Sequence, residues 1–454
     1  MKISVTSRAF WVHQFIRQLL SPWQVTFTSL DEAEFSIVYG EKPPEKVESV
    51  VIPSYSKDFT RWLKNIGLSI EVKNGIEFFV HATQQTVLSM TPNFYYHYEG
   101  SIEYDSFNNQ PFLIKLDNVT LLTIDVIKEY SRIMDEILNP NVSNLYRILT
   151  SLPIPYRMAP RGLRDFFMRR KTKETTFKFC DKLPLDFLRF LLIRAIGEVT
   201  REKLVRKKWN GKQYVFSLTH DIDTYNGLKK AVVLKKLEDR YDIPSAWYIP
   251  TKKYKLEADI IRDLANHGEI GAHGTSHDGK LVKLPKLKII KRLCEAKQNL
   301  ETIIGEPVEG FRAPLLQFNV KFIQALVEAG YLYDASVPTW EPTHPYTMKP
   351  HGIGTVNLVK INGFFEIPLT FPQDHQMLYI LCMTPEQTVE TWSNILDVVR
   401  DIGGICTILI HPDYNLANSG NLTIYEEMLS NITADNRAWI TIPRDCVRER
   451  AINS

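Results

Sequence analysis

The sequence predicts an α/β protein in which a seven-unit β/α barrel over residues 206–454 follows a smaller α/β domain over residues 1–205. Its 454 residues exceed what one domain usually needs, at about 150 residues per domain. From Gln213 onward, strand and helix patterns alternate regularly, which is typical of a parallel sheet with crossover helices. Eight of the eleven histidines lie between His220 and His411, so the polar chemistry is concentrated in this second part.

The first domain shows short strands mixed with helices. We expect strands at 2–6, 23–28 and 35–40, and helices at 8–20 and 183–203, the last being a helical linker. A proline-rich break covers 151–160, and a basic stretch covers 161–173. The Asn210–Gly211 pair is a turn signal and places the boundary close to it. Nothing in this domain indicates an activity.

The second domain repeats a strand and a helix about seven times. Strands are expected at 214–219, 245–249, 269–273, 308–313, 331–337, 364–371, 405–411 and 438–442, and helices at 227–241, 256–268, 284–304, 319–330, 384–404 and 422–432. This number of units in about 240 residues suits a closed or nearly closed barrel. An open, doubly wound sheet is the alternative.

Composition excludes several classes of protein. With 44% hydrophobic and 24% charged residues, the chain is typical of a globular protein, and its net charge of +3 does not indicate nucleic acid as a partner. Five scattered cysteines without CxxC spacing form neither a disulfide framework nor a zinc knuckle. Charged residues interrupt the N-terminal apolar residues, and no run of about 18 apolar residues occurs. We therefore expect a cytoplasmic protein without a transmembrane segment.

Polar side chains follow nearly every strand of the second domain. In a barrel these positions share one end, where functional residues of such folds lie. The residues that follow the strands are His220, Asp221 and Asp223, His273 and His277, Arg312, Asp334, Asp374 and His375, and His411 and Asp413.

Three of these residues have the spacing of a metal site. His273 and His277 are four residues apart, so over a helical turn both imidazoles would point the same way. Asp223 supplies a carboxylate from a neighbouring barrel position, and two histidines with one carboxylate form an open site for a divalent ion. Taken alone, two histidines at this spacing are more often surface or core residues.

Asp221, Arg312 and His411 complete a hydrolytic site. Side chains alternate along a strand, so Asp221 and Asp223 face the same way and their like charges need compensation. A metal on Asp223 and Arg312 beside Asp221 would supply it, which leaves Asp221 as the base acting on water. His411 fits the acid that protonates a leaving amine. Each residue alone also has a structural explanation: a turn for the aspartates, a surface ion pair for Arg312 and a packed imidazole for His411.

The segments "THDID", "HGTSH", "GFRAP" and "ILIHP", in this order, resemble the polysaccharide deacetylase family, carbohydrate esterase family 4. The resemblance covers about residues 213–442. It implies a seven-unit barrel that holds one divalent metal, zinc (Zn2+) first with Co2+, Ni2+ or Mn2+ as alternatives, and that removes an N- or O-acetyl group from a sugar. It also implies Asp221 as base, Asp223, His273 and His277 as metal ligands, and catalytic roles for Arg312 and His411.

The sequence departs from the family at two points. Ile222 separates two aspartates that many members have adjacent, and the fourth motif is carried by either Asp374 or Asp334. We expect Asp374 to bind substrate, together with Trp340 and Tyr346. These two aromatic residues belong to a long loop at 338–354 that a barrel would place over its mouth, although loop packing explains them equally well.

The expected substrate is an acetylated carbohydrate, such as a small or lipid-linked intermediate of surface polysaccharide assembly. The basic stretches 161–173 and 201–208 could meet a phosphate group or a membrane surface, but a solvated helix face and a linker also account for them. Two other functions stay open. One is hydrolysis of a different C–N bond, such as a cyclic amide or formamide, at the same metal site, and the other is carbohydrate binding without catalysis.

Overall fold

A computed structural model describes residues 1–45, 47–54, 56–66, 68–73, 76–82, 87–88, 113–116, 118–122, 124–142, 162, 166, 169–170, 179–417 and 420–452. The chain separates into two compact units. Met1–Met134 and Pro184–Lys207 form the first, and Asp135–Leu183 and Lys208–Ser454 form the second. The predicted division into two contiguous domains, 1–205 and 206–454, stays a prediction. The two compact units differ from it, because residues 135–183 group with the second unit. The expected break at 151–160 and most of the basic stretch 161–173 lie outside the described residues.

The first unit is built on a mixed sheet in the order β2-β1-β3-β4-β9-β8-β7, which is parallel from β2 to β9. Its strands are β1 (Lys2–Thr6), β2 (Thr26–Phe27), β3 (Phe35–Tyr39), β4 (Ser49–Ile52), β7 (Val87–Leu88), β8 (Leu113–Leu116) and β9 (Val119–Leu122), and β5 (Leu68–Lys73) with β6 (Ile76–Ala82) forms a separate hairpin. Its helical segments are α1 (Phe10–Leu20), η1 (Leu30–Glu32), α2 (Lys57–Asn65), α4 (Val126–Leu138), whose end passes into the second unit, and α7 (Pro184–Thr200).

Helix α7 is apolar on almost every side. Twelve of its seventeen residues are buried, including Leu191, Ile193 and Ile196. It contacts α1, β4 and β9 of its own unit. A helix that is apolar all round belongs in a core rather than on a surface, which is why this segment packs inside the first unit.

The second unit is a curved sheet of parallel strands in the order β16-β14-β13-β12-β11-β10-β17. The backbone amides of Thr370 and Phe371, which follow β16, donate to the Thr407 carbonyl of β17 and so join the two ends of the sheet. The strands are β10 (Tyr214–Asp221), β11 (Ser245–Ile249), β12 (Gly268–Ala272), β13 (Gly310–Phe311), β14 (Tyr333–Asp334), β16 (Phe364–Glu366) and β17 (Ile405–Leu409), with β15 (Val359–Ile361) antiparallel to β16 and β18 (Ala438–Ile440) parallel to the start of β10.

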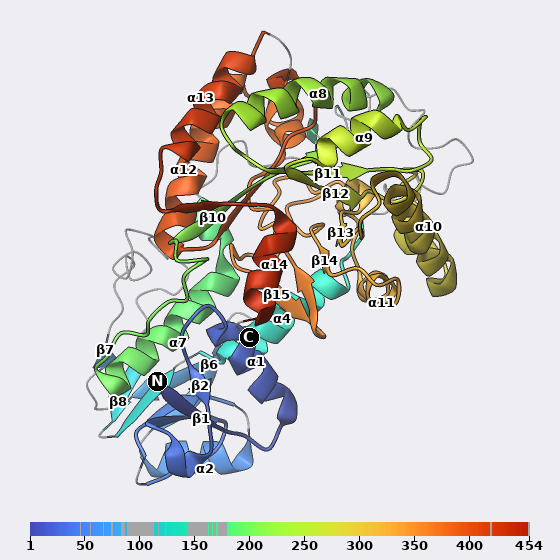
Figure 1. Ribbon diagram of the computed structural model, residues 1–454. Coiled ribbons are helices and arrows are strands. Elements are labelled where there is room, and N and C mark those ends of the chain that lie inside the picture. The colour runs from blue at the N-terminus through green and yellow to red at the C-terminus, as the bar shows by residue number, and fades with distance from the viewer. Residues whose placement is uncertain are drawn as a thin grey trace. The chain divides into compact units, whose positions relative to one another are not determined.

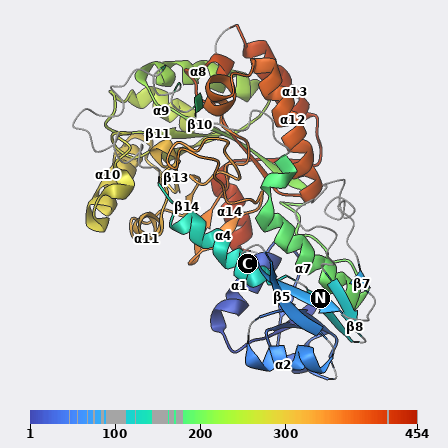
Figure 2. The same cartoon turned by 180° about the vertical axis from the view of Figure 1, so that it is seen from behind.

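Helices α8 to α13 surround this sheet on its outside, as the two opposite views agree (Figures 1 and 2). The helices are α8 (Tyr225–Arg240), α9 (Ala258–Ala265), α10 (Lys286–Ile304), α11 (Val320–Glu328), α12 (Pro385–Ile402), α13 (Leu422–Thr433) and α14 (Pro443–Ile452), with 3-10 turns η4 (Phe179–Lys182), η5 (Leu281–Lys283), η6 (Pro314–Leu316) and η8 (Asn415–Ala417) and a π-helix at η7 (Gln376–Ile380). Thr384 and Gln387 form a capping box at the start of α12, and α10 ends at Gly305 in the left-handed conformation.

The predicted fold class is confirmed, and the alternation of strands and helices follows the order read from the sequence. The strands expected at 331–337 and 364–371 are shorter, because β14 and β16 are limited to Tyr333–Asp334 and Phe364–Glu366. The β15–β16 hairpin was not expected, although Asn362 and Gly363, both at positive φ, are a strong hairpin signal. No helix in the described ranges is long and apolar enough to cross a membrane.

Candidate metal centre and active site

The end of β10 brings the two aspartates to one place. Asp221 is the last residue of β10, and Asp223 follows two residues later. Asp223 Oδ1 and Asp221 Oδ2 lie 3.5 Å and 3.8 Å from the same atom, His273 Nε2. The two carboxylates therefore face the same side, as alternation along an extended chain requires.

His273 and His277 are brought together by a bend and not by the helical turn that their spacing suggested. The segment after β12 has no helical residue before Leu281. Gly274 has a φ of 72°, and His277 itself has a φ of 49°, which is unusual for a residue with a side chain. Such backbone strain is found at functional sites, where the surrounding structure enforces it. The ring centroids are 5.0 Å apart.

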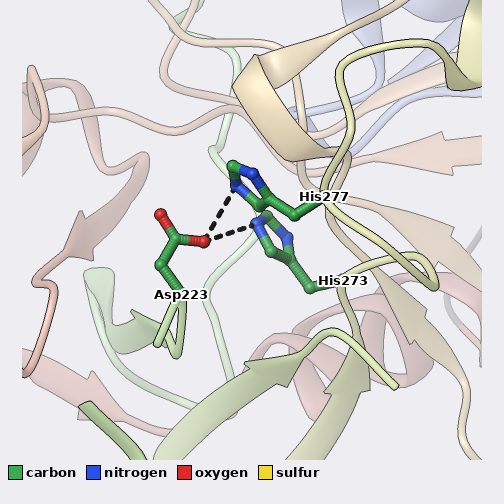
Figure 3. Close-up of side chains that lie close together, drawn as sticks. All are labelled: Asp223, His273 and His277. Carbon is green, nitrogen blue, oxygen red and sulfur yellow. Dashed lines mark ion pairs between the residues drawn. The ribbon is translucent and has the colours of Figure 1, made fainter. Parts of the chain in front are cut away.

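Asp223, His273 and His277 point their side chains toward one another (Figure 3). Asp223 Oδ1 lies 2.9 Å from His277 Nε2 and 3.5 Å from His273 Nε2. One potential ligand atom from each residue falls within 4.8 Å of the others. Burial by itself would raise the pKa of Asp223, but the charges of His277 and Lys253 hold it well below its usual value.

The donor set of this cluster fits a divalent metal. His273 Nδ1 lies 2.8 Å from the Arg312 carbonyl oxygen, which can only accept, so this nitrogen carries the proton. The lone pair is then on Nε2, the atom that faces Asp223. Atoms bound to one ion at about 2.1 Å are roughly 3 Å apart. Asp223 Oδ1 lies at similar distances, 2.9 Å and 3.5 Å, from the two imidazole nitrogens.

Arg312, which follows β13, contacts Asp221. It is fully buried. Its NH1 donates to Asp221 Oδ1 at 3.2 Å and to Thr219 Oγ1 at 2.9 Å, and its Nε donates to the Ala335 carbonyl at 2.9 Å. The guanidinium carbon also lies 4.3 Å from the ring centroid of Tyr248. These contacts fix both the charge beside Asp221 and the orientation of that carboxylate.

His411 and Asp374 form a second pair: His411 lies two residues after β17, and Asp374 lies in the segment between β16 and η7. Asp374 Oδ1 lies 2.6 Å from His411 Nδ1, and its Oδ2 accepts from the His411 backbone amide at 2.8 Å. Burial alone would lower the pKa of His411, but the charge and hydrogen bond of Asp374, with smaller effects of Asp223 and Asp221, raise it to about 9. Both carboxylate oxygens of Asp374 are engaged with His411, so this geometry assigns Asp374 to orienting the histidine. Substrate binding by Asp374 stays an untested prediction.

Asp334, the other residue considered for the fourth family motif, lies in a separate buried group. Ser336 Oγ donates to its Oδ1 at 2.6 Å, and Glu366 is the neighbouring carboxyl. Burial raises the pKa of Asp334 to about 7 and that of Glu366 well above its usual value. Both carboxyl groups therefore hold a proton to a higher pH than exposed ones do, and no contact joins Asp334 to His411 among the described residues.

The loop at 338–354 is folded in on itself. The backbone groups of Glu341 and His351 exchange hydrogen bonds, and the side chains of Trp340 and Tyr346 are 7% and 6% exposed. So little free ring surface does not favour sugar stacking, and a substrate contact by either residue stays a prediction.

Sequence reasoning missed several residues that contact the site. Lys253 Nζ lies 3.7 Å from Asp223 Oδ1, and the Tyr414 ring stacks on His411 with centroids 4.3 Å apart. Thr219 could have been found, because it stands two residues before Asp221 on the same face of β10. Lys253 and Tyr414 lie in loops, where no periodic pattern marks them.

Comparison with known proteins gives a family for part of the second unit. Residues 210–333 match the sequence profile of the polysaccharide deacetylase family, which confirms the resemblance carried by the motifs. This segment contains Asp221, Asp223, His273, His277 and Arg312 but ends before Asp374 and His411. The chain has no match among curated proteins.

Several solved structures are similar to about half of the chain. A candidate polysaccharide deacetylase from Mycobacterium smegmatis is 21% identical, with 54% of this chain and 93% of that one covered and a TM-score of 0.48. An allantoinase is 16% identical, covering 53% and 91% at a TM-score of 0.43. A candidate polysaccharide deacetylase from Pseudomonas aeruginosa PAO1 is 15% identical, covering 53% and 92% at a TM-score of 0.42.

Proposed function

We propose that the second unit, which carries the polysaccharide deacetylase match over residues 210–333, is a metal-dependent hydrolase that removes an acetyl group from an acetylated sugar. The observation that carries the proposal is the convergence of Asp223, His273 and His277 within 4.8 Å beside the buried Asp221–Arg312 pair. A structural role alone does not require a carboxylate and two imidazoles to converge in this way.

Asp223, His273 and His277 would hold the ion, which we take to be zinc, with cobalt, nickel and manganese as alternatives. When bound, it would supply Lewis acidity that lowers the pKa of water and polarises a carbonyl. Three protein ligands leave open positions for water and substrate. The tautomer of His273 that a metal ligand needs is already set, because its Nδ1 lies 2.8 Å from the Arg312 carbonyl oxygen.

Asp221 is the base in this proposal. Its Oδ1 is held by Arg312, which leaves Oδ2, the oxygen nearer to His273, to accept a proton from water. The water oxygen then bonds to the acetyl carbon. Because Arg312 is fixed by Thr219, Ala335 and Tyr248, the carboxylate keeps its position during the proton transfer.

His411 is the acid. Its pKa of about 9 keeps the ring protonated at neutral pH, with Nδ1 bonded to Asp374 and Nε2 left to donate. That proton passes to the sugar nitrogen as the C–N bond breaks, which yields acetate and a free amine. For an O-acetyl group the same proton passes to the leaving oxygen, so the geometry favours neither bond.

The same residues would also hydrolyse a C–N bond outside a sugar, and this is the second candidate. A binding protein without catalysis is the third, and the presence of acid, base and three ligand side chains together speaks against it. A small or lipid-linked sugar of surface polysaccharide assembly remains our preferred substrate. The cytoplasmic location and a peripheral membrane contact also stay predictions.

Acetate release tests the proposal. Purified protein supplied with zinc should release acetate from at least one acetylated amino sugar, nucleotide-linked sugar or sugar ester in a panel, and Asp221→Asn should abolish release. Matched non-sugar amides separate the first candidate from the second. No release from any compound by protein that demonstrably binds the metal would contradict the deacetylase function.

A further inference from the structure

His220, the residue before Asp221, is buried and held on three sides. Its side chain is fully inaccessible, and its ring stacks on Trp247 of β11 with centroids 4.0 Å apart and planes 16° apart. Nδ1 lies 2.9 Å from the carbonyl oxygen of Ile410, and Nε2 lies 3.1 Å from Glu238 Oε1. A carbonyl oxygen only accepts, so Nδ1 carries a proton and donates it.

The contact with Ile410 acts on the peptide unit that leads into His411. The carbonyl of this unit accepts from His220, and its N–H, which belongs to His411, donates to Asp374 Oδ2 at 2.8 Å. The peptide plane is thus fixed at both ends. Because this plane sets the direction in which the His411 side chain leaves the backbone, His220 and Asp374 together determine where the imidazole lies.

Glu238 of α8 anchors the other side of the His220 ring. Its Oε1 accepts from Tyr425 Oη at 2.7 Å, and its Oε2 accepts from Ser245 Oγ at 2.5 Å. Two hydroxyl donors, one from β11 and one from α13, thus hold this buried carboxyl group beside the His220 ring. An anchor of this kind limits rotation of the imidazole, so the bond to Ile410 is held in one direction.

We infer that His220 is a positioning residue: it ties the strand end that carries the base, Asp221, to the peptide that carries the acid, His411. The inference rests on the proposed function and extends it to a residue outside the reacting groups. Stacking on Trp247 would be served by any flat ring. The bond between Nδ1 and the Ile410 carbonyl is what positioning requires, because it fixes the peptide that leads into His411, while Nε2 faces Glu238.

Two substitutions separate the contacts of the ring. Asparagine places its amide nitrogen near the position of Nδ1, so His220→Asn keeps a donor for Ile410 and loses Glu238. Glutamine reaches toward the position of Nε2, so His220→Gln keeps Glu238 and loses Ile410. Tyr425→Phe is the control, because it removes one donor from Glu238 and leaves Ile410 untouched.

We expect His220→Gln to lower kcat by about tenfold or more, since misplacing a catalytic group by about 1 Å can cost that much. KM and bound metal should stay near the wild-type values. His220→Asn and Tyr425→Phe should stay within about threefold of wild-type kcat, a difference of less than 1 kcal/mol. Equal losses in the Asn and Gln variants, or losses that follow the metal content, would show a purely structural residue and overturn the inference.

A second readout needs no substrate. In wild-type protein labelled with ¹⁵N-histidine, the Nδ1 proton of His220 should appear as a slowly exchanging resonance, since it is buried and bonded. In the folded Gln variant, the NMR titration midpoint of His411 should fall, because the Ile410–His411 peptide turns away from Asp374. Absence of the protected proton, or an unchanged His411 midpoint in that variant, would contradict the inference even if no acetylated sugar is ever hydrolysed.

Discussion

At the scale of single residues, the site depends on charged side chains whose charged form burial alone would disfavour. His411 would lose its proton in an apolar setting, yet Asp374 holds its pKa at about 9. Burial would raise the pKa of Asp223, yet the charges of His277 and Lys253 hold it low. Each charged group is stabilised by a named partner, so removing that partner should change its protonation in a predictable direction.

Asp374→Asn should move the alkaline limit of activity to lower pH. The acid must be protonated, so activity is lost as pH rises through the His411 pKa, which is near 9 in the wild type. Without the carboxylate this pKa falls, and the midpoint of the kcat–pH profile should drop by about one unit or more. Asp413→Asn is the control, since Asp413 accepts from Thr224 Oγ1 and leaves the midpoint in place. An unchanged midpoint in Asp374→Asn would exclude His411 as the acid.

Asp221→Asn should lower stability as well as activity. It leaves the guanidinium of Arg312 buried without its carboxylate, which costs about 3 kcal/mol for a broken buried pair. Adding Arg312→Met removes that charge and should restore much of the unfolding free energy while activity stays absent. Urea unfolding of the single and double variants measures both values. Additive losses in the double variant would mean that the two residues do not form a coupled pair.

At the scale of elements, the barrel places short polar segments at the carboxyl ends of its strands, and these segments set the geometry. His273 and His277 converge through a bend with Gly274 and His277 at positive φ. The sequence spacing alone suggested a helical turn, which would also place the two imidazoles on the same side. Strand positions were predictable from apolar runs, whereas the path of a strained loop depends on the packing around it.

Gly271→Ala should disturb the site from a distance. Gly271 lies in β12, and a Cβ there would meet the ring of Tyr248, the residue against which Arg312 packs. Overpacking of this kind costs about 1–3 kcal/mol and should shift Arg312 away from Asp221. Gly227→Ala in α8 is the matched control, because its nearest neighbours are at 3.5 Å, an ordinary contact. Thermal unfolding and kcat of both variants check this. Equal stability of the two variants would contradict the close packing of β12 on Tyr248.

At the scale of the whole molecule, the buried carboxyl pair of Asp334 and Glu366 should make stability depend on pH. Burial raises both pKa values, that of Asp334 to about 7. The folded pair keeps a proton that the unfolded chain releases near pH 4. Its contribution is therefore complete below that pH and is lost as pH rises through about 7.

Asp334→Asn should weaken this dependence, because an amide does not titrate in this range. The difference in unfolding free energy between pH 5 and pH 8 should be smaller in the variant than in wild type by about 1 kcal/mol or more, the value of one pKa unit. Urea unfolding at the two pH values measures it. The same difference in both proteins would show that Asp334 does not titrate near pH 7 in the folded protein.

The fold class and the catalytic candidates could be read from the sequence, because apolar periodicity and polar residues at strand ends are local signals. The bonds between Asp374 and His411, between Arg312 and Thr219, and between His220 and Ile410 could not. They join residues 37, 93 and 190 positions apart, and only the closed sheet brings them together. The first unit was recognised as α/β, but no chemical cluster pointed to a role for it.

Metal content is the measurement that tests the central claim most directly. Protein supplied with zinc and freed of excess should retain about one divalent ion per chain, as expected for three side chains sharing one open site. His273→Ala should lose it, whereas Tyr425→Phe, a buried change outside the cluster, should keep it. No retained ion in the wild type with zinc, cobalt, nickel or manganese would contradict the account, since Asp223, His273 and His277 would then converge for another reason.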